Sequence, residues 1–186
     1  AQALQGGANL ALVGKPGLGK SVTLAHLAST LARQEDTTGA LSGITPYLVH
    51  AADILPIRPN QAALEALIEA ISANVSALTL PRLPHFIRST FNDGSALLLL
   101  DGLDELPPEQ VDQVVGLLAG LLDAYPQARI VAAVSPEYLG GLTRLGFQVV
   151  SPAAWDEQDK LNFINKWSEL WSSFIAREKD RQRIDV

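Results

Sequence analysis

The chain has 186 residues, of which 20 are acidic and 14 are basic, so its formal net charge is −6. With 47% hydrophobic and 18% charged residues it can bury a core, which excludes a disordered chain, and its length fits one domain of ordinary size. The basic residues form no cluster, which disfavours nucleic acid as a partner. The absence of cysteine excludes disulfides, thiolate metal sites and a cysteine nucleophile, and is typical of a reducing compartment such as the cytoplasm. The apolar runs, such as residues 96–100, are far shorter than the roughly 20 residues of a membrane span, so no membrane segment is expected.

Short apolar runs alternate along the chain with stretches of helical periodicity. In chain order we predict a strand at residues 9–13, a glycine-rich turn, a helix at 21–33, a polar loop at 34–43 and a strand at 44–50. There follow a helix at 61–75 capped by Asn60, a short amphipathic piece at 84–92, a strand at 96–100 and a helix from 108 to about 122. Strands at 128–134 and 147–150 complete the series. This alternation predicts a parallel sheet covered by helices on both sides.

The alternation of strands and helices ends at about residue 152. A long helix is predicted from about residue 155, followed by a mostly charged tail at 176–186. Its apolar face is formed at helical spacing by Leu161, Ile164, Trp167, Trp171 and Phe174. We interpret the tryptophans as core residues that pack against the sheet, with a docking face for another domain as the alternative. Residues 1–152 are therefore assigned to an α/β domain, and residues 153–186 to the truncated start of a helical domain.

The strongest motif lies between the first strand and the first helix. Residues 14–21 satisfy the pattern G-x-x-x-x-G-K-[ST] in the strand-loop-helix context that this pattern requires. Glycines let the backbone N–H groups point inward, and the helix adds the positive end of its dipole, so the loop suits phosphate oxygens. We expect Lys20 to neutralise the β- and γ-phosphates and Ser21 to bind Mg²⁺. The predicted nucleotide-contacting residues of this segment are Gly14, Lys15, Pro16, Gly17, Leu18, Gly19, Lys20, Ser21 and Val22.

A second motif follows the most apolar strand. Residues 97–106 read Leu-Leu-Leu-Leu-Asp-Gly-Leu-Asp-Glu-Leu, so the strand ends in the carboxylates of Asp101, Asp104 and Glu105. The carboxyl ends of parallel strands form the ligand-binding edge of such sheets. Neighbouring carboxylates repel one another, by about 1 kcal/mol per pair at 4 Å in water, and no basic residue is close in the sequence. The opposite charge is therefore expected from Mg²⁺ on a nucleotide or from the distant Lys20.

The two motifs together resemble the NACHT family of STAND-class P-loop NTPases, which are signalling switches. The resemblance covers about residues 9–150 and extends into the following helix. It implies a three-layer α/β/α fold with a five-stranded parallel sheet of order 5-1-4-3-2, ATP or ADP with Mg²⁺ as ligands, and oligomers of the full-length protein on activation. It also implies that Asp101 organises Mg²⁺, and that Asp104 and Glu105 position or activate the attacking water, with Glu105 favoured as the base. Residues 1–152 would then be the P-loop nucleotide-binding domain.

The sequence departs from that family at the end of the fourth strand. Relatives commonly carry an arginine there that senses the terminal phosphate, but Ser135 stands in its place. Ser135 is predicted either to hydrogen-bond a phosphate or the attacking water, or to cap the following helix. Arg129 and Arg144 precede strands, so they are expected at the other end of the sheet. His50 and Asp53 follow the second strand and are further candidates for facing the phosphates.

Three functions remain open at this point. The first is a slow Mg²⁺-dependent ATPase that acts as a conformational and oligomerisation switch in signalling. The second is a nucleotide-gated scaffold with little or no hydrolysis, suggested by the missing arginine. The third is a motor ATPase of the AAA+ type, although Asp-Gly-Leu-Asp-Glu departs from its usual acidic pair. The expected partners are the nucleotide, other domains of the same chain and further copies of the protein.

Overall fold

The computed structural model describes residue 4, residues 6–34 and residues 41–184, without the side chains of 176–184. The strands are β1 (Leu10–Val13), β2 (Thr45–His50), β3 (Ala96–Asp101), β4 (Arg129–Val134) and β5 (Gln148–Val150). The helices are α2 (Lys20–Ala32), α3 (Ala63–Ala73), α4 (Leu83–Asn92), α5 (Pro108–Ala124), α6 (Leu139–Arg144) and α7 (Glu157–Ile184). Short 3-10 helices form η2 (Ala51–Ile54), η3 (Leu103–Glu105) and η4 (Pro136–Tyr138). Most of the predicted loop at 34–43 lies outside the described residues.

The five strands form one parallel sheet in the order β2-β3-β4-β1-β5. Read from the other edge, this is the order 5-1-4-3-2, so the predicted α/β fold and its strand order are confirmed. β1 lies between β4 and β5, with Leu12 opposite Ala133 and Val150. Because all strands run in the same direction, the carboxyl ends of β1, β3 and β4 meet at one edge of the sheet. This is the edge at which open α/β sheets bind their ligands.

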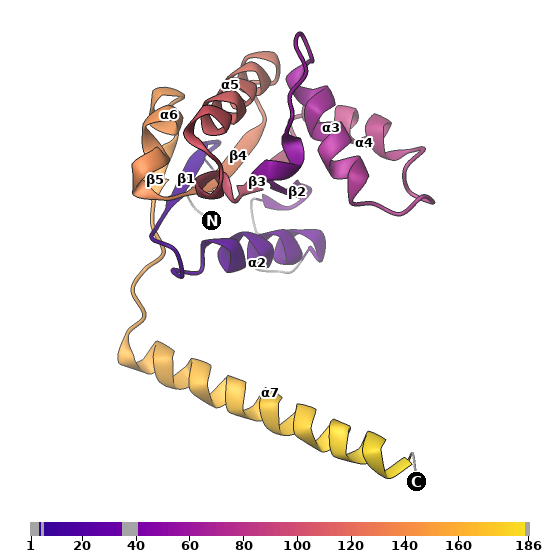
Figure 1. The fold of residues 1–186 in the computed structure, drawn as a ribbon, viewed down its shortest axis with the longest axis vertical. Helices are drawn as coiled ribbons and strands as arrows, with labels where there is room; N and C mark the ends of the chain where they lie inside the picture. The colour runs from indigo at the N-terminus through magenta and orange to yellow at the C-terminus, as the bar shows by residue number, and fades with distance from the viewer. Residues whose placement is uncertain (1–3, 5, 35–40, 185–186) are drawn as a thin grey trace. The chain divides into compact units, whose positions relative to one another are not determined.

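Helices cover both faces of the sheet, as β3 shows most clearly. Residues 96–100 of this strand have 0% exposure, and successive side chains of a strand point to opposite faces. Leu98 and Leu100 belong to the core that includes α3, α4 and α5, whereas Leu97 and Leu99 share a second core with Leu24 of α2. Figure 1 shows α2 on one side of the sheet and α3, α4 and α5 on the other. β3 therefore lies at the centre of a three-layer domain. Each of its fully buried leucines contributes about 2 kcal/mol to folding.

A polar pair joins β2 to α4 inside this domain. Tyr47 Oη lies 2.7 Å from Thr90 Oγ1, and the Thr90 hydroxyl donates to the Ile87 carbonyl at 2.9 Å. Since the single hydroxyl proton of Thr90 is used in that bond, Tyr47 is the donor of the first one. The Tyr47 ring also stacks on Phe91, with 6.0 Å between ring centroids. Burial raises the pKa of Tyr47 above its ordinary value of 10.0.

The helix after β2 starts later than the sequence predicts. Its first residue is Ala63 and its cap position is Ala62, which offers no side-chain hydrogen bond. Asn60 has a φ of 61°, in the left-handed region that asparagine tolerates better than most residues. Two hydrogen bonds between Arg58 and Gln61, at 2.9 and 3.1 Å, close a turn around it. Asn60 therefore belongs to this turn, and its predicted role as helix cap is wrong.

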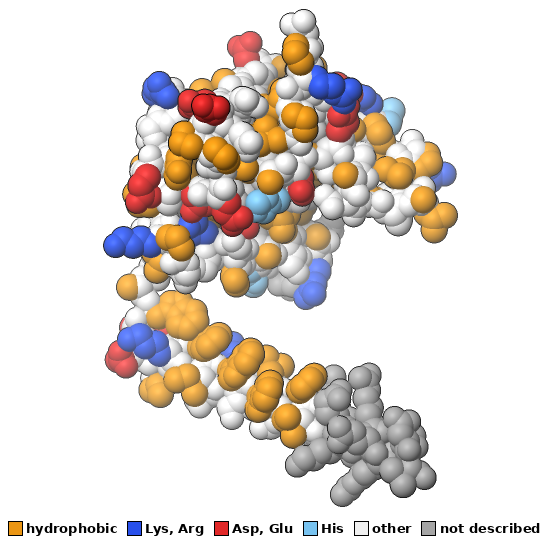
Figure 2. All heavy atoms as spheres, viewed as in Figure 1, with side chains coloured by type: hydrophobic (Ala, Val, Ile, Leu, Met, Phe, Trp, Pro, Cys, Tyr) orange, Lys and Arg blue, Asp and Glu red, His pale blue; other side chains and the backbone are white. Residues whose placement is uncertain are grey.

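The chain divides into two compact units, Ala1–Pro152 and Ala153–Val186. In the second unit, from Trp155 into α7, neighbouring aromatic rings contact one another with centroid distances between 5.1 and 6.5 Å. The rings are those of Trp155, Phe163, Trp167, Trp171 and Phe174, and each side chain is at least 50% exposed. Figure 2 shows hydrophobic side chains following one side of this helix. These rings contact one another within their own unit, and the predicted packing of the tryptophans against the sheet stays a prediction.

Candidate functional site

The loop between β1 and α2 owes its shape to glycines. Gly17 and Gly19 have φ angles of 85° and 77°, in the left-handed region that favours glycine. A Cβ atom at either position would meet no heavy atom within 4 Å, so backbone conformation rather than crowding requires glycine there. At the start of the loop, the N–H of Gly14 donates to the carbonyl of Val134 at 3.2 Å. The loop is thus attached to the end of β4, and there is free space beside its glycine backbone.

The amino terminus of α2 follows this loop directly. The helix has 13 residues, begins at Lys20 and has no acidic residue in its first turn. The first N–H groups of a helix have no partner within the helix and carry partial positive charge. Ser21 and Val22, the next two residues, are exposed. An anion is therefore favoured at this end of α2.

Lys20 connects the loop to the acidic motif. Its Nζ donates to the Gly14 carbonyl at 2.7 Å and lies 3.1 Å from Asp104 Oδ2. The side chains of Lys20 and Asp104 are 9% and 14% exposed, and a buried charge of this kind requires a partner. Of the two sources of positive charge that the sequence suggests for the acidic motif, Lys20 is thus already in contact with it.

The acidic motif is formed by the end of β3 and the turn after it. Asp101 is the last residue of β3, and Gly102, with a φ of 71°, starts η3. Leu103 is fully buried and anchors η3 in the core. Asp104 turns toward Lys20, whereas the side chain of Glu105 is 69% exposed. The three carboxylates therefore differ in their surroundings although they are close in sequence.

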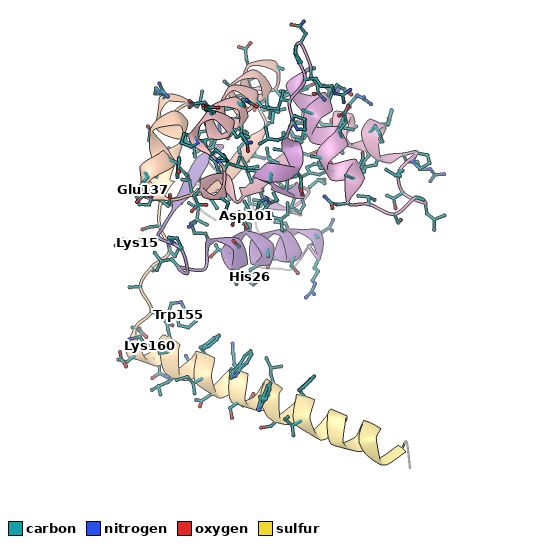
Figure 3. The ribbon with its side chains drawn as sticks, in the orientation of Figure 1. Lys15, His26, Asp101, Glu137, Trp155 and Lys160 are labelled. Carbon is teal, nitrogen blue, oxygen red and sulfur yellow. The ribbon has the colours of Figure 1, made fainter. Side chains whose placement is uncertain are left out.

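Both motifs line one cavity of about 420 Å³. Figure 3 shows Asp101 next to the amino-terminal half of α2. The lining residues are Pro16, Gly17, Gly19, Lys20, Ser21, Val22, Asp101, Asp104 and Glu105, all of which the sequence analysis assigns to the site. The other assigned residues, Gly14, Lys15, Leu18 and Ser135, do not line it. Cavities of about 400 and 410 Å³ lie elsewhere along α5, so the volume does not distinguish this one; the glycine-rich loop opposite three carboxylates does.

The oxygen atoms of this cavity fit a magnesium ion that is bound together with phosphate. Ser21 offers a hydroxyl and Asp101 a carboxylate, and hard cations such as Mg²⁺ prefer oxygen ligands. In the part of the chain that the structure describes, no group of three or more His, Cys, Asp or Glu side chains could hold a metal by itself. Mg²⁺ commonly takes one or two protein ligands and completes its shell with substrate phosphates and water. The donor set therefore suits a magnesium nucleotide rather than a metal held by protein alone.

Ser135 lies at the end of β4, where the family resemblance leads us to expect an arginine. It is 6% exposed and occupies the cap position of η4, but its side chain makes no capping hydrogen bond, so that part of the prediction is wrong. A hydrogen bond from Ser135 lowers the pKa of the Glu137 carboxyl, and the charges of Lys15 and Lys20 act in the same direction. Figure 3 shows Lys15 and Glu137 on the same side of the domain. Arg129 starts β4 and so lies at the opposite end of that strand, as expected.

His50, at the carboxyl end of β2, contacts the acidic motif. The register of the sheet places it opposite Asp101, and its Nε2 lies 3.4 Å from Glu105 Oε2. From the sequence, His50 is a candidate only for facing the phosphates, and its contact with Glu105 is not predicted. The signal that could have found it is the pairing of β2 with β3, which aligns the ends of the two strands. Asp53, the other candidate after β2, does not line the cavity.

A family model for the NACHT domain matches residues 9–169. The chain belongs to the NACHT family. The match covers both motifs, the whole sheet and the first part of α7, which confirms the resemblance seen in the sequence. A NACHT domain is a nucleotide-binding P-loop NTPase domain, and the family generally binds its nucleotide with Mg²⁺. A comparison with curated proteins finds no match.

Over the described ranges, none of the helices of this NACHT domain combines the length and the apolar character that crossing a bilayer requires.

Proposed function

We propose that this NACHT domain is a switch whose conformation and oligomeric state depend on whether it holds ATP or ADP, and that it hydrolyses ATP slowly with Mg²⁺. The observation that carries the proposal is the cavity in which Lys20 and Ser21 of the loop face the three carboxylates. A glycine-rich loop, a helix terminus and a lysine suit a polyphosphate, and the carboxylates opposite suit its metal ion and an attacking water.

Each group in the cavity has a role under this proposal. Residues 14–22 hold the phosphates, with Lys20 at the β- and γ-phosphates, and Ser21 and Asp101 hold Mg²⁺. When bound, the ion neutralises charge that develops on the phosphates. Glu105 accepts the proton of the attacking water. It suits this role better than Asp104, because Asp104 is engaged by Lys20 whereas Glu105 is exposed beside the cavity.

One observation favours a second candidate, a nucleotide-gated scaffold with little hydrolysis. Ser135 and the carboxylate of Glu137 occupy the end of β4, where a cation would stabilise charge on the terminal phosphate. In that case occupancy of the site, rather than turnover, sets the conformation.

The domain assignment and the cellular setting complete the proposal. We assign residues 1–152 to the nucleotide-binding domain and residues 153–186 to the start of a helical domain, which the division of the chain into two compact units supports. The absence of cysteine supports the cytoplasm as its compartment. A role in signalling, with other domains of the chain and further copies as partners, follows the family resemblance.

Nucleotide binding is tested by titration with ATP, ADP and GTP, with and without Mg²⁺. Lys20→Ala should abolish binding, because it removes the cation of the loop. Lys166→Ala removes an exposed lysine of α7 and serves as the matched control. Retained affinity in the Lys20 variant would contradict the proposed site.

Hydrolysis and assembly separate the two candidates. If the switch hydrolyses ATP, Glu105→Gln should lower turnover by about 100-fold or more, the usual contribution of a general base. If the domain is a scaffold, ATP and a non-hydrolysable analogue should change the oligomeric state of the full-length protein equally, as measured by analytical ultracentrifugation. Assembly that requires turnover would exclude the scaffold.

A further inference from the structure

A hydrogen bond from the segment that follows β2 holds the ring of His50 in place. Its Nδ1 accepts a hydrogen bond from the backbone N–H of Ala52 at 3.3 Å, so this side chain occupies the cap position of η2. An accepting Nδ1 carries a lone pair, which places the proton of the neutral ring on Nε2. His50 therefore presents an N–H donor in the direction of its second contact.

That second contact is Glu105. Nε2 lies 3.4 Å from Glu105 Oε2, which is longer than an ordinary hydrogen bond and is the kind of contact that shortens when a catalytic site is filled. The three residues in contact thus belong to three segments, His50 to β2, Ala52 to η2 and Glu105 to η3, which meet because β2 and β3 are neighbours.

Gly102 leaves the space that the ring occupies. A Cβ atom at this position would come within 2.8 Å of His50 Cδ2 and closer still to Nε2 and Cε1. Atoms do not approach that closely, so any larger residue would displace the ring. The glycine of the acidic motif thus serves two purposes, since its φ of 71° also favours glycine.

His50 lies next to Glu105 and does not line the cavity. Its side chain is 38% exposed but does not line the cavity, whereas Glu105 does. A glutamate that is 69% exposed samples many rotamers unless a neighbour restricts it. His50, whose Nε2 lies 3.4 Å from the Glu105 carboxylate, is such a neighbour.

We propose that His50 is a positioning residue for the general base: its Nε2–H donates to Glu105 Oε2 and keeps the carboxylate directed at the cavity. This inference rests on the proposed role of Glu105. His50 keeps its proton throughout. As the water oxygen bonds to the terminal phosphorus and the bond to the leaving diphosphate breaks, Glu105 Oε1 accepts the water proton and later releases it to the phosphate product.

Two substitutions distinguish the role of Nδ1, which contacts Ala52, from that of Nε2, which contacts Glu105. His50→Asn keeps an oxygen near the position of Nδ1, so the bond to Ala52 and the cap of η2 are retained, but it cannot reach Glu105. His50→Gln carries an amide N–H to about the position of Nε2. We expect His50→Asn to lower kcat by about 10- to 100-fold with unchanged affinity for ATP, and His50→Gln to retain most of the rate.

The double variant tests whether the effect passes through Glu105. Added to Glu105→Gln, the His50→Asn change should have no further effect on kcat, because the base that it positions is gone. Wild-type kcat in His50→Asn, equal losses in the Asn and Gln variants, or a full additive loss in the double variant would each overturn the proposal.

A spectroscopic measurement decides the matter independently of turnover. Nitrogen NMR of the imidazole at neutral pH should show Nε2 protonated and Nδ1 accepting, and Glu105→Gln should shift the Nε2 signal alone. An unchanged Nε2 signal would overturn the inference even in an active protein. If wild-type protein binds ATP but does not turn it over, the proposed hydrolysis fails, and the NMR result still decides whether His50 holds Glu105.

Discussion

Lys20 Nζ and Asp104 Oδ2 lie 3.1 Å apart, with both side chains close to fully buried. The lysine belongs to the phosphate loop and the aspartate to the acidic motif, so this ion pair connects the two halves of the site. If Lys20 binds phosphate as proposed, that phosphate competes with a carboxylate that is already in place.

Asp104→Asn should therefore destabilise the protein and strengthen its response to ligand. Lys20 would lose its negatively charged partner and keep only uncharged oxygen acceptors such as the Gly14 carbonyl, and we expect the free energy of unfolding to fall by about 1–3 kcal/mol. Since nucleotide then supplies the missing negative charge, ATP or ADP should raise Tm more in the variant than in the parent. Calorimetry measures both quantities, and Asp123→Asn, at an exposed position of α5, is the control. An equal ligand-induced rise in Tm would show that Asp104 does not compete for Lys20.

Gly19→Ala tests the backbone of the phosphate loop. The left-handed conformation costs a residue with a Cβ atom about 1–2 kcal/mol, so unfolding should become easier by that amount. Gly140→Ala is the matched control, because Gly140 lies in α6 with open space around it and without a positive φ, and alanine there should stabilise the helix by about 0.5–1 kcal/mol. Thermal unfolding followed by circular dichroism compares them. A neutral Gly19→Ala would contradict the strained geometry.

Tyr47→Phe should change how stability depends on alkaline pH. The folded protein holds the phenolic proton more tightly than the unfolded chain, because burial raises the pKa of Tyr47. The contribution of this proton is therefore present below pH 10 and is lost as the pH rises from about 10 toward the folded pKa. The phenylalanine variant should be less stable by about 1 kcal/mol at neutral pH, since the bond to Thr90 is lost, and should show a shallower decline above pH 10. Denaturant unfolding at a series of pH values measures the difference between the two slopes, and equal slopes would refute the assignment.

Ser135→Ala should raise the pKa of Glu137 toward 4.5. The hydrogen bond from Ser135 is the main cause of the lowered pKa, and the variant keeps only the smaller contributions. Carbon NMR of the carboxyl group follows the titration directly. Ser151→Ala, at an exposed position of the same domain, should leave the pKa unchanged. If Ser135→Ala has no effect either, the Ser135–Glu137 contact does not form in solution.

The sequence predicts those parts of the site that depend on local pattern. A glycine-rich loop between strand and helix, and an apolar strand that ends in acids, are recognisable without knowledge of tertiary structure, and the cavity is lined by the residues these motifs name. The strand order came from the family resemblance, because alternation of strand and helix alone does not determine it. His50 was not identified as a neighbour of Glu105, since their contact depends on which strands pair and in which register.

Other differences arise where local preference and tertiary structure diverge. Asn60 is a suitable helix cap by residue type, but the turn closed by Arg58 and Gln61 delays the start of α3. Trp167 and Trp171 of α7 are spaced as core residues, and within their own unit their rings stack on one another. Periodicity identifies the apolar side of a helix and gives no information on what covers it.

All three tryptophans of the protein, Trp155, Trp167 and Trp171, belong to the unit Ala153–Val186. Indole fluorescence of the unmodified chain therefore originates wholly from residues outside the unit that carries the sheet and the candidate site. Residues 1–152 contain no tryptophan. If the three native tryptophans are replaced, a single tryptophan added at an exposed position near the cavity would give a fluorescence signal that reports on that site alone.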